Sequence, residues 1–351
     1  MDEQLEARRG RARMKYSALS KYRTELMGLA MLWVMLYHAW SLDLGLRLLN
    51  AVRAFGFGGV DIFILLSAMG LTMSLCRREQ KFGPFMARRA LRILPAYFVV
   101  MLPYTLFLVL RRGAPVSAFL WNSTLLSYWF QTPGRFNWYV SGIMVFYLLT
   151  PPCVRLLKKA KHRAVLTAAG MAAGLVLCFV LMKHELWQYL DVPYRIPIFF
   201  LGLLMGFYAR EERGIGKKGL LFWCFWLLCG LAYFAAAVRS VVKVVYLPPS
   251  LLLLFTTLPL CLVCCFLFER LPLGGLRRFL RLVGESSLEI YLLNVSLFAE
   301  LDALQRYLPF NPRHCVYYLL AFALNIFLGA CFHRLMEFCT AKLRARQARN
   351  R

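Results

Sequence analysis

The sequence has few acidic residues and few breaks in its hydrophobic pattern. Only 17 of its 351 residues are Asp or Glu, against 43 Lys and Arg. It has no linker long enough to separate domains and no internal repeat at a fixed period. We therefore predict a single domain over residues 1–351, with basic cytoplasmic tails at 1–23 and 337–351.

Two further absences argue against a cleavable signal peptide and against a metal site. No A-x-A-like cleavage site follows the first apolar run, so we expect that run to be retained as a membrane helix. Cys261, Cys264 and Cys265 have a CxxCC spacing, but no second cysteine pair or histidine lies nearby. We therefore predict no metal site.

Apolar residues dominate the composition. The chain is 60% hydrophobic and 15% aromatic, with a mean hydropathy of +0.57, which is typical of an integral membrane protein. Its net charge of +26 does not indicate nucleic-acid binding, because the basic residues form short clusters between apolar runs. Such clusters are typical of cytoplasmic loops that face anionic lipid.

Windows of about 20 apolar residues predict an all-α membrane protein, a bundle of about ten transmembrane helices with both termini in the cytoplasm. In this topology 32 of the 43 Lys and Arg residues lie inside and 11 outside, as the positive-inside rule requires. The predicted helices cover residues 24–43, 55–75, 92–110, 136–153, 164–183, 194–210, 219–238, 248–268, 284–301 and 314–336.

His38 lies in the first predicted helix, where an ionisable group is costly and is therefore expected to have a function. An imidazole that titrates near neutrality suits removal of a proton from a hydroxyl nucleophile. The alternative is that His38 has only a structural role, as a hydrogen-bonding residue between packed helices.

The second predicted helix carries small residues and one acid. Asp61 is its only acidic residue, near the outer end, where it would orient an imidazole or a substrate hydroxyl, or simply lie at the membrane interface. The small residues suit close packing of helices; they are Gly58, Gly59, Ser67, Ala68 and Gly70.

Three arginines mark the cytoplasmic start of the third predicted helix. Arg88 and Arg92 are four residues apart and share a helix face, with Arg89 beside them. Guanidinium groups of this kind bind phosphate through charge-assisted hydrogen bonds. The topology of a cytoplasmic loop explains them equally well.

Glu289 lies among apolar residues of the ninth predicted helix, with Tyr291 and Asn294 beside it. We expect it to face the interior of the bundle, as a proton relay or the partner of an arginine. Arg195, at the outer start of the sixth predicted helix, is one candidate partner.

The outer segment 111–138, which ends in Trp138, is rich in Trp, Tyr, Asn and Arg. Aromatic faces beside polar groups suit sugar rings, but membrane interfaces are also enriched in Trp and Tyr. The sequence alone therefore allows both a sugar-binding segment and a segment at the membrane interface.

Several of these segments, in this order and spacing, resemble motifs of one family. The run "GLAMLWVMLYHAW" resembles the motif that ends in the family's catalytic histidine, here His38, and "GGVDIFILLSAMGL" resembles the pattern that contains Asp61. "RRALRILPAYF", "WYVSGIMVFYLLTPP" and "GESSLEIYLLN" resemble its later motifs. The chain is similar to bacterial membrane acyltransferases of the acyltransferase-3 type.

The resemblance implies a multi-pass protein of the bacterial cytoplasmic membrane that acylates a hydroxyl of an extracytoplasmic glycan or related envelope acceptor. The donor would be cytosolic acyl-CoA, by resemblance acetyl-CoA, with its phosphates at Arg88, Arg89 and Arg92. His38 would be the general base and Asp61 would orient it or the acceptor. Besides the donor, the implied partners are the lipid bilayer and the acceptor; the oligomeric state stays open.

Two residues depart from the family pattern. The family's arginine eleven residues before the histidine is Met27 here, although Arg23, fifteen residues before His38, lies on roughly the same helix face. The late histidine is Asn294, which removes any proton transfer at that position. These departures favour a first alternative, in which the protein is a non-catalytic scaffold. A second alternative is a transporter or flippase of a glycan precursor, although the sequence has no inverted repeat to support it.

Overall fold

The computed structural model describes residues 14–239, 249–304 and 315–349, and over these residues the chain is helical and contains no strand. The chain divides into two compact units. Unit 1 comprises residues 1–26, 61–80 and 148–277, and unit 2 comprises residues 27–60, 81–147 and 278–351. Three of the 11 Lys and Arg residues predicted to lie outside the membrane, Lys243, Arg306 and Arg313, are not among the described residues.

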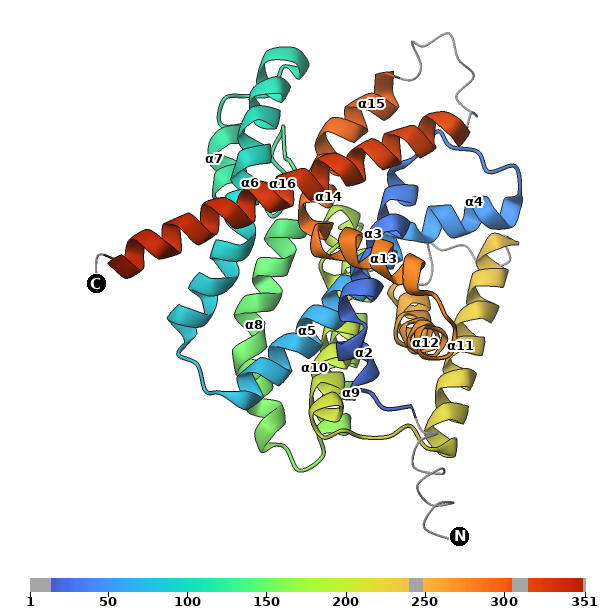
Figure 1. Cartoon of the computed structure of the whole chain (residues 1–351). Coiled ribbons are helices and arrows are strands. Elements are labelled where there is room, and N and C mark those ends of the chain that lie inside the picture. The colour runs from blue at the N-terminus through green and yellow to red at the C-terminus, as the bar shows by residue number, and fades with distance from the viewer. Residues whose placement is uncertain (1–13, 240–248, 305–314, 350–351) are drawn as a thin grey trace. The chain divides into compact units, whose positions relative to one another are not determined.

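Unit 1 is built around pairs of neighbouring helices. The pairs α9 with α10 and α11 with α12 pack against each other, and α10 also contacts α12 (Figure 1). Its complete elements are α2 (Ala18–Lys21), α9 (Arg163–Lys183), η2 (Trp187–Tyr189), η3 (Pro193–Arg195), α10 (Ile196–Arg210), α11 (Lys217–Val238) and α12 (Pro249–Arg270).

Unit 2 packs α14 against both α6 and α16 (Figure 1). Its complete elements are α4 (Arg47–Ala54), η1 (Phe55–Gly58), α6 (Phe82–Arg112), α7 (Ala118–Ser123), α14 (Ser287–Leu293), η4 (Asn294–Phe298), α15 (Ala299–Leu304) and α16 (Cys315–Arg349). Four helices belong partly to each unit: α3 (Arg23–His38), α5 (Gly59–Arg77), α8 (Tyr139–Lys159) and α13 (Gly274–Glu285).

The described residues contain seven helices long and apolar enough to cross a membrane, or eight if the bent pair Gly274–Glu285 and Ser287–Asp302 is one span. The predicted number of ten is therefore not confirmed. At 1.5 Å per residue, α3 with 16 residues and α10 with 15 are about 22–24 Å long, shorter than a hydrocarbon core of about 30 Å. The positions of the two termini relative to the membrane stay predictions.

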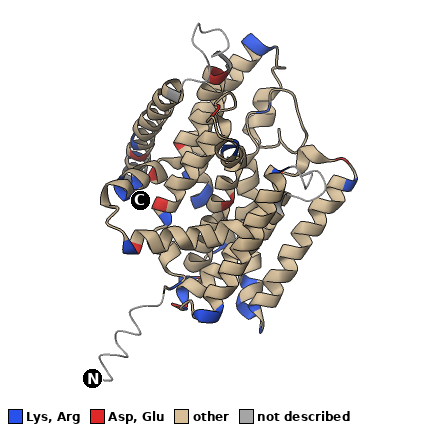
Figure 2. Ribbon diagram, turned by 90° about the vertical axis from the view of Figure 1, so that its right-hand side faces the viewer, with Lys and Arg blue, Asp and Glu red and all other residues tan. Residues whose placement is uncertain are grey.

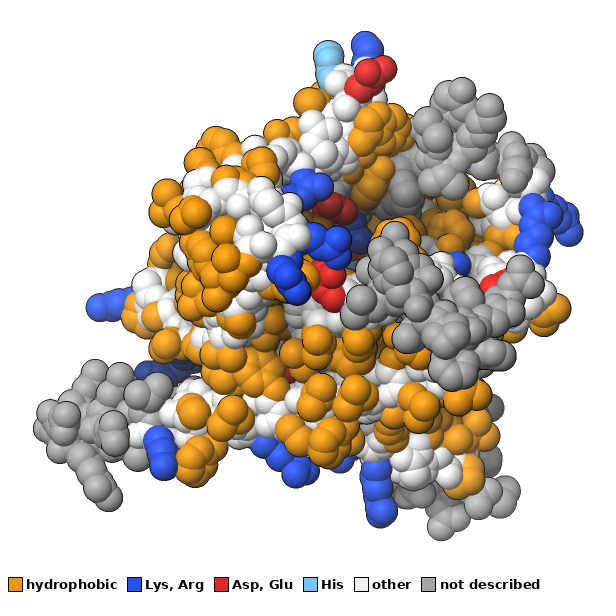
Figure 3. Space-filling view, turned by 90° about the horizontal axis from the view of Figure 1, so that it is seen from above, with side chains coloured by type: hydrophobic (Ala, Val, Ile, Leu, Met, Phe, Trp, Pro, Cys, Tyr) orange, Lys and Arg blue, Asp and Glu red, His pale blue; other side chains and the backbone are white. Residues whose placement is uncertain are grey.

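Hydrophobic side chains are exposed on the long helices, as contact with lipid requires. Leu221 and Phe225 of α11 are 69% and 63% exposed, and Leu320 and Phe327 of α16 are 67% and 63% exposed. Monomeric soluble proteins rarely expose so many large apolar residues together. Figure 3 shows hydrophobic side chains over much of the face drawn, and in Figure 2 Lys and Arg lie mainly near helix ends.

Part of the predicted N-terminal tail belongs to unit 1. The backbone of Lys15 pairs with that of Gly214 as an isolated β-bridge, and the amide of Ile215 donates to the carbonyl of Met14 at 2.8 Å. Tyr16 is buried, and its hydroxyl accepts a hydrogen bond from the Trp223 indole at 2.8 Å. Residues 14–22 are therefore part of the packed structure rather than of a free tail.

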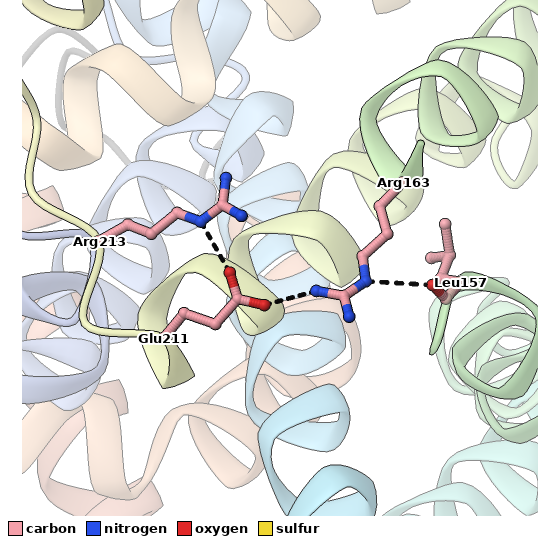
Figure 4. Close-up of polar contacts among 4 residues, drawn as sticks. All are labelled: Leu157, Arg163, Glu211 and Arg213. Atoms are coloured by element: carbon pink, nitrogen blue, oxygen red, sulfur yellow. Dashed lines mark hydrogen bonds and ion pairs between the residues drawn. The ribbon is translucent and has the colours of Figure 1, made fainter. Parts of the chain in front are cut away.

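Glu211, just after α10, joins the two loops at one end of unit 1. Its carboxylate accepts hydrogen bonds from Arg163 at 2.5 Å and from Arg213 at 2.7 Å, and Arg163 also donates to the carbonyl of Leu157 (Figure 4). Burial alone would raise the pKa of Glu211, but the hydrogen bonds from the two arginines outweigh it and lower the pKa. The carboxylate therefore stays ionised at neutral pH.

Small residues let α10 approach α5 closely within unit 1. A Cβ atom on Gly202 would lie 2.6 Å from the carbonyl oxygen of Leu65 and 2.9 Å from the Cβ of Ala68. One on Gly206 would lie 2.5 Å from the Cβ of Thr72. The predicted close packing of the second helix is thus confirmed at Ala68, and glycines supply the other side of the contact.

We predict that Gly202→Ala destabilises the protein, because the added methyl group meets backbone atoms that have no room to move. Overpacking of this kind typically costs about 1–3 kcal/mol. The measurement is the midpoint of thermal unfolding of the purified, detergent-solubilised protein. Gly219→Ala in α11 is the matched control, since its nearest neighbour would be Ile215 Cγ2 at 3.4 Å. Equal midpoints for the two variants would contradict the packing described.

Candidate functional site

Asp61 and Arg195 form a buried ion pair in unit 1. Asp61 Oδ2 lies 3.5 Å from Arg195 Nε, and the two side chains are 0% and 4% exposed. Arg195 also donates through Nη1 to the carbonyl of Asp191 at 2.9 Å. The pair ties α5 to the start of α10, because Asp61 lies in the first turn of α5 and Arg195 immediately precedes α10. The catalytic role expected of Asp61 stays a prediction.

Arg23 begins α3 and lies against α5 within unit 1. A Cβ atom on Gly70 would come within 3.1 Å of its Nη1 atom, so the glycine makes room for the guanidinium. Its expected role as a substitute for the family's arginine stays a prediction.

His38 is the last residue of α3 and lies in unit 2. Its Nδ1 atom is 2.8 Å from the carbonyl oxygen of Val34. Because a carbonyl oxygen only accepts, Nδ1 must carry the hydrogen, which leaves the lone pair of the neutral ring on Nε2. The end of the helix is fixed nearby, where Arg53 Nη1 donates to the carbonyl of Ala39 at 2.9 Å. The hydrogen bond to Val34 thus fixes the tautomer and the orientation of the imidazole.

A small pocket opens beside His38 within unit 2. Its polar lining residues are His38, Asn294, Asp302, Tyr317 and Tyr318, and its apolar lining comes from α3, η4, α15 and α16. Tyr318 donates its hydroxyl hydrogen to Asp302 Oδ1 at 2.7 Å, and Tyr317 donates to the carbonyl of Leu301 at 3.1 Å. The pocket therefore combines an imidazole, a carboxylate and two aromatic side chains.

Asn294 reaches this pocket from a helix that packs tightly on α16. A Cβ atom on Gly329 would lie 2.4 Å from Ile290 Cγ1, so α14 and α16 are in close contact. One turn along each helix, Asn325 Nδ2 donates to Asn294 Oδ1 at 3.2 Å. Both asparagines are buried, at 3% and 0% exposure.

Glu289 pairs with a histidine instead of the arginine that we considered. Its Oε1 atom lies 3.2 Å from His333 Nδ1, and His333 Nε2 lies 3.5 Å from the exposed Glu337. Arg195, the partner suggested by topology, pairs with Asp61. The prediction that Glu289 faces the interior agrees with its 5% exposure, but the predicted pairing with Arg195 is not what the structure contains.

Tyr291 and Trp138 belong to a chain of aromatic contacts in unit 2. The ring of Tyr291 meets that of Tyr139 edge-on at 5.0 Å, and Tyr139 meets Trp138 at 5.9 Å. Trp138 also contacts Tyr128 at 6.5 Å. Neither Trp138 nor Tyr291 is among the residues that line the pocket, so their expected substrate contacts stay predictions.

The three arginines occupy two faces of α6. Arg88 and Arg92 are exposed, whereas Arg89 is half-buried and lies over the ring of Phe85, 5.9 Å from its centre. The shared face of Arg88 and Arg92 agrees with their spacing of one helical turn. Phosphate binding at this face stays a prediction.

Sequence reasoning missed Asp302, Tyr317, Tyr318, Asn325 and His333, although each lies in or beside these clusters. The available signal was the polar residue inside an apolar run, the same criterion that selected His38. Asn325 in "FALNIFLG" and His333 in "CFHRLM" both meet it.

The comparison with protein families agrees with the motif order. The model of the acyltransferase domain family of the acyltransferase-3 type matches residues 26–334, so the chain belongs to this family. Searches of curated proteins and of solved structures gave no significant match. The family, together with the apolar helices, identifies a multi-pass membrane acyltransferase.

We predict that either Asp61→Asn or Arg195→Leu destabilises the protein by about 3–5 kcal/mol, because each leaves a buried charge without compensation. The double variant should cost less than the sum of the two single changes. Thermal unfolding of all three purified variants measures this coupling. Glu212→Gln is the control, because the Lys15–Glu212 pair is 54% and 59% exposed and should contribute about 0–1 kcal/mol. Strict additivity of the two buried substitutions would contradict the pairing.

Proposed function

We propose that this protein is an O-acyltransferase of the bacterial cytoplasmic membrane. It transfers an acyl group, by family resemblance acetyl, from cytosolic acyl-CoA to a hydroxyl of an extracytoplasmic glycan or related envelope acceptor. The observation that carries the proposal is the oriented imidazole of His38, which lines a pocket in a chain of an acyltransferase family.

His38 acts as the general base. Its Nδ1 hydrogen is held by the carbonyl of Val34, so Nε2 is the atom that accepts a proton. Backbone anchoring of one ring nitrogen also fixes the plane of the ring, which lowers the cost of aligning it with an acceptor hydroxyl. General-base catalysis typically contributes 10²–10⁴-fold to the rate.

The proposed reaction is balanced in atoms and protons. Nε2 removes the proton of the acceptor hydroxyl while the oxygen attacks the thioester carbonyl. The tetrahedral intermediate then breaks its carbon–sulfur bond, and the CoA thiolate leaves. The imidazolium returns its proton to that thiolate, which gives the ester, free CoA and a neutral histidine.

Arg88 and Arg92 supply the site for the CoA phosphates, with Arg89 beside them. Their exposure on one face of α6 supports this role, because a phosphate must reach them from solution. Guanidinium groups suit phosphates through bidentate, charge-assisted hydrogen bonds.

The acceptor occupies the pocket beside His38. Tyr317 and Tyr318 present ring surfaces of the kind that pack on sugars, and Asp302 offers acceptor oxygens to hydroxyl groups. This combination supports a polyhydroxylated acceptor over a purely apolar one.

We predict that His38→Gln reduces CoA release from acetyl-CoA by about 10²–10⁴-fold, because the side chain loses its basic nitrogen. Binding of acetyl-CoA should stay within threefold of the wild type. The measurement is chromatographic detection of free CoA after incubation of acetyl-CoA with purified protein, where water takes the place of the acceptor hydroxyl and acetate is the second product. His184→Gln, an exposed histidine, is the matched control. Full activity of His38→Gln would refute the assignment of the base.

We predict that Arg88→Ala/Arg92→Ala raises the dissociation constant of acetyl-CoA by about tenfold or more, since two charge-assisted contacts are lost. Isothermal calorimetry in detergent measures the affinity. Lys158→Ala/Lys159→Ala at the end of α8 removes the same charge from another exposed basic pair. Equal affinities for the two double variants, or no binding by the wild type, would contradict the proposed donor.

A further inference from the structure

Asn294 brings a side-chain amide to the pocket that His38 lines. Both residues belong to unit 2 and both line the same cavity. Asn294 is 3% exposed, so its amide is shielded from bulk water. Such a position makes hydrogen bonds electrostatically stronger than they are in water.

The neighbouring helix fixes the orientation of this amide. Asn325 Nδ2 donates to Asn294 Oδ1 at 3.2 Å, so the oxygen of Asn294 is already used. Its Nδ2 group is buried and has no hydrogen-bond partner among the described residues. A buried donor without a partner costs about 1–3 kcal/mol, so its retention points to a partner that binds during function.

The other polar residues of the pocket do not offer such a donor. The hydroxyl hydrogen of Tyr318 is given to Asp302, and that of Tyr317 to the carbonyl of Leu301. The Nδ1 hydrogen of His38 is given to Val34. Among the polar residues that line the pocket, Asn294 therefore carries the neutral donor, Nδ2, that is left without a partner among the described residues.

The local helix geometry sets Asn294 apart as well. Asn294 is the first residue of η4, a π-helical segment from Asn294 to Phe298 between α14 and α15. Single π turns are rare in helices and occur frequently at functional sites. Two lining residues of the pocket, Asn294 and Phe298, stand at the two ends of this segment.

We propose that Asn294 Nδ2 donates a hydrogen bond to the thioester carbonyl oxygen of the acyl donor as negative charge develops there. This inference rests on the proposed function and assigns the oxyanion-stabilising residue of its reaction. A donor that is already oriented in a shielded site stabilises the tetrahedral intermediate more than the ground state. Asn325 is the positioning residue, because it holds the oxygen of Asn294.

Asn294→Asp tests the proposal most directly. The aspartate keeps an oxygen for the hydrogen bond from Asn325, but it replaces the N–H donor with a second oxygen and a negative charge, which would repel the developing oxyanion. We expect kcat for CoA release to fall by about 10²–10³-fold, as for loss of one oxyanion donor, with the KM for acetyl-CoA within threefold. Asn294→Ala should show the same pattern, a lower kcat with a KM for acetyl-CoA within threefold of the wild type.

Asn294→His separates catalysis from packing. An imidazole restores an N–H donor, so this variant should recover at least tenfold in kcat over Asn294→Ala. Asn50→Ala is the matched control, since Asn50 bonds Asp43 and the amide of Leu44, and it should retain wild-type kcat. Thermal unfolding midpoints verify that each variant is folded.

The outcomes separate this inference from the proposed function. Wild-type activity together with a kcat for Asn294→Asp and Asn294→Ala within threefold of it would overturn the role of Asn294 and leave His38 as the base. A wild type that releases no CoA above a boiled control would overturn the proposed function and the oxyanion role with it. Loss of acetyl-CoA binding in Asn294→Asp would also overturn the role, because an oxyanion donor is not needed for binding.

Discussion

The structure depends on one constraint, which is that polar groups inside apolar helices must find their partners within the chain. Hydrocarbon offers no water to solvate a charge or an amide, so each such group costs several kcal/mol unless it is paired. The Asp61–Arg195 ion pair, the Asn294–Asn325 hydrogen bond and the Glu289–His333 contact each pair polar side chains in this way, while Asn294 Nδ2 is the buried group whose partner we propose to be the substrate. All three join helices, so the same pairs that satisfy the side chains also fix which helices are neighbours.

The sequence predicts the class of protein and the close packing of one helix. Apolar windows and the distribution of basic residues indicate a helical membrane protein, and the small residues of α5 indicate close packing, for which the structure identifies α10 as the partner helix. The partners of Arg195 and Glu289 could not be predicted, because pairing depends on helix rotation and depth, which periodicity alone does not determine. The predicted number of ten spans is not confirmed, because the apolar windows extend beyond the ends of the short helices α3 and α10.

Family membership identifies the class of reaction, whereas the contacts of individual side chains bear on the role of each residue. The family model extends over most of the chain and identifies the reaction class. The contacts of individual side chains then distinguish the parts of the site: His38 has an anchored imidazole, whereas Asn294 has an anchored amide. An imidazole moves protons and an amide only donates or accepts hydrogen bonds, so the catalytic roles that we propose for the two residues differ.

The π turn at Asn294–Phe298 sets the rotation of the residues that follow it. Each residue of an α-helix turns the chain by about 100°. A π turn holds one residue more than an α-helical turn, so if the same residues formed a regular α-helix, everything after the segment would be rotated by about that angle. Leu301 and Asp302 would then leave the wall of the pocket while Asn294 stayed in place. The segment thus keeps Asn294 at its start and the residues after it on the side of the helix that lines the pocket.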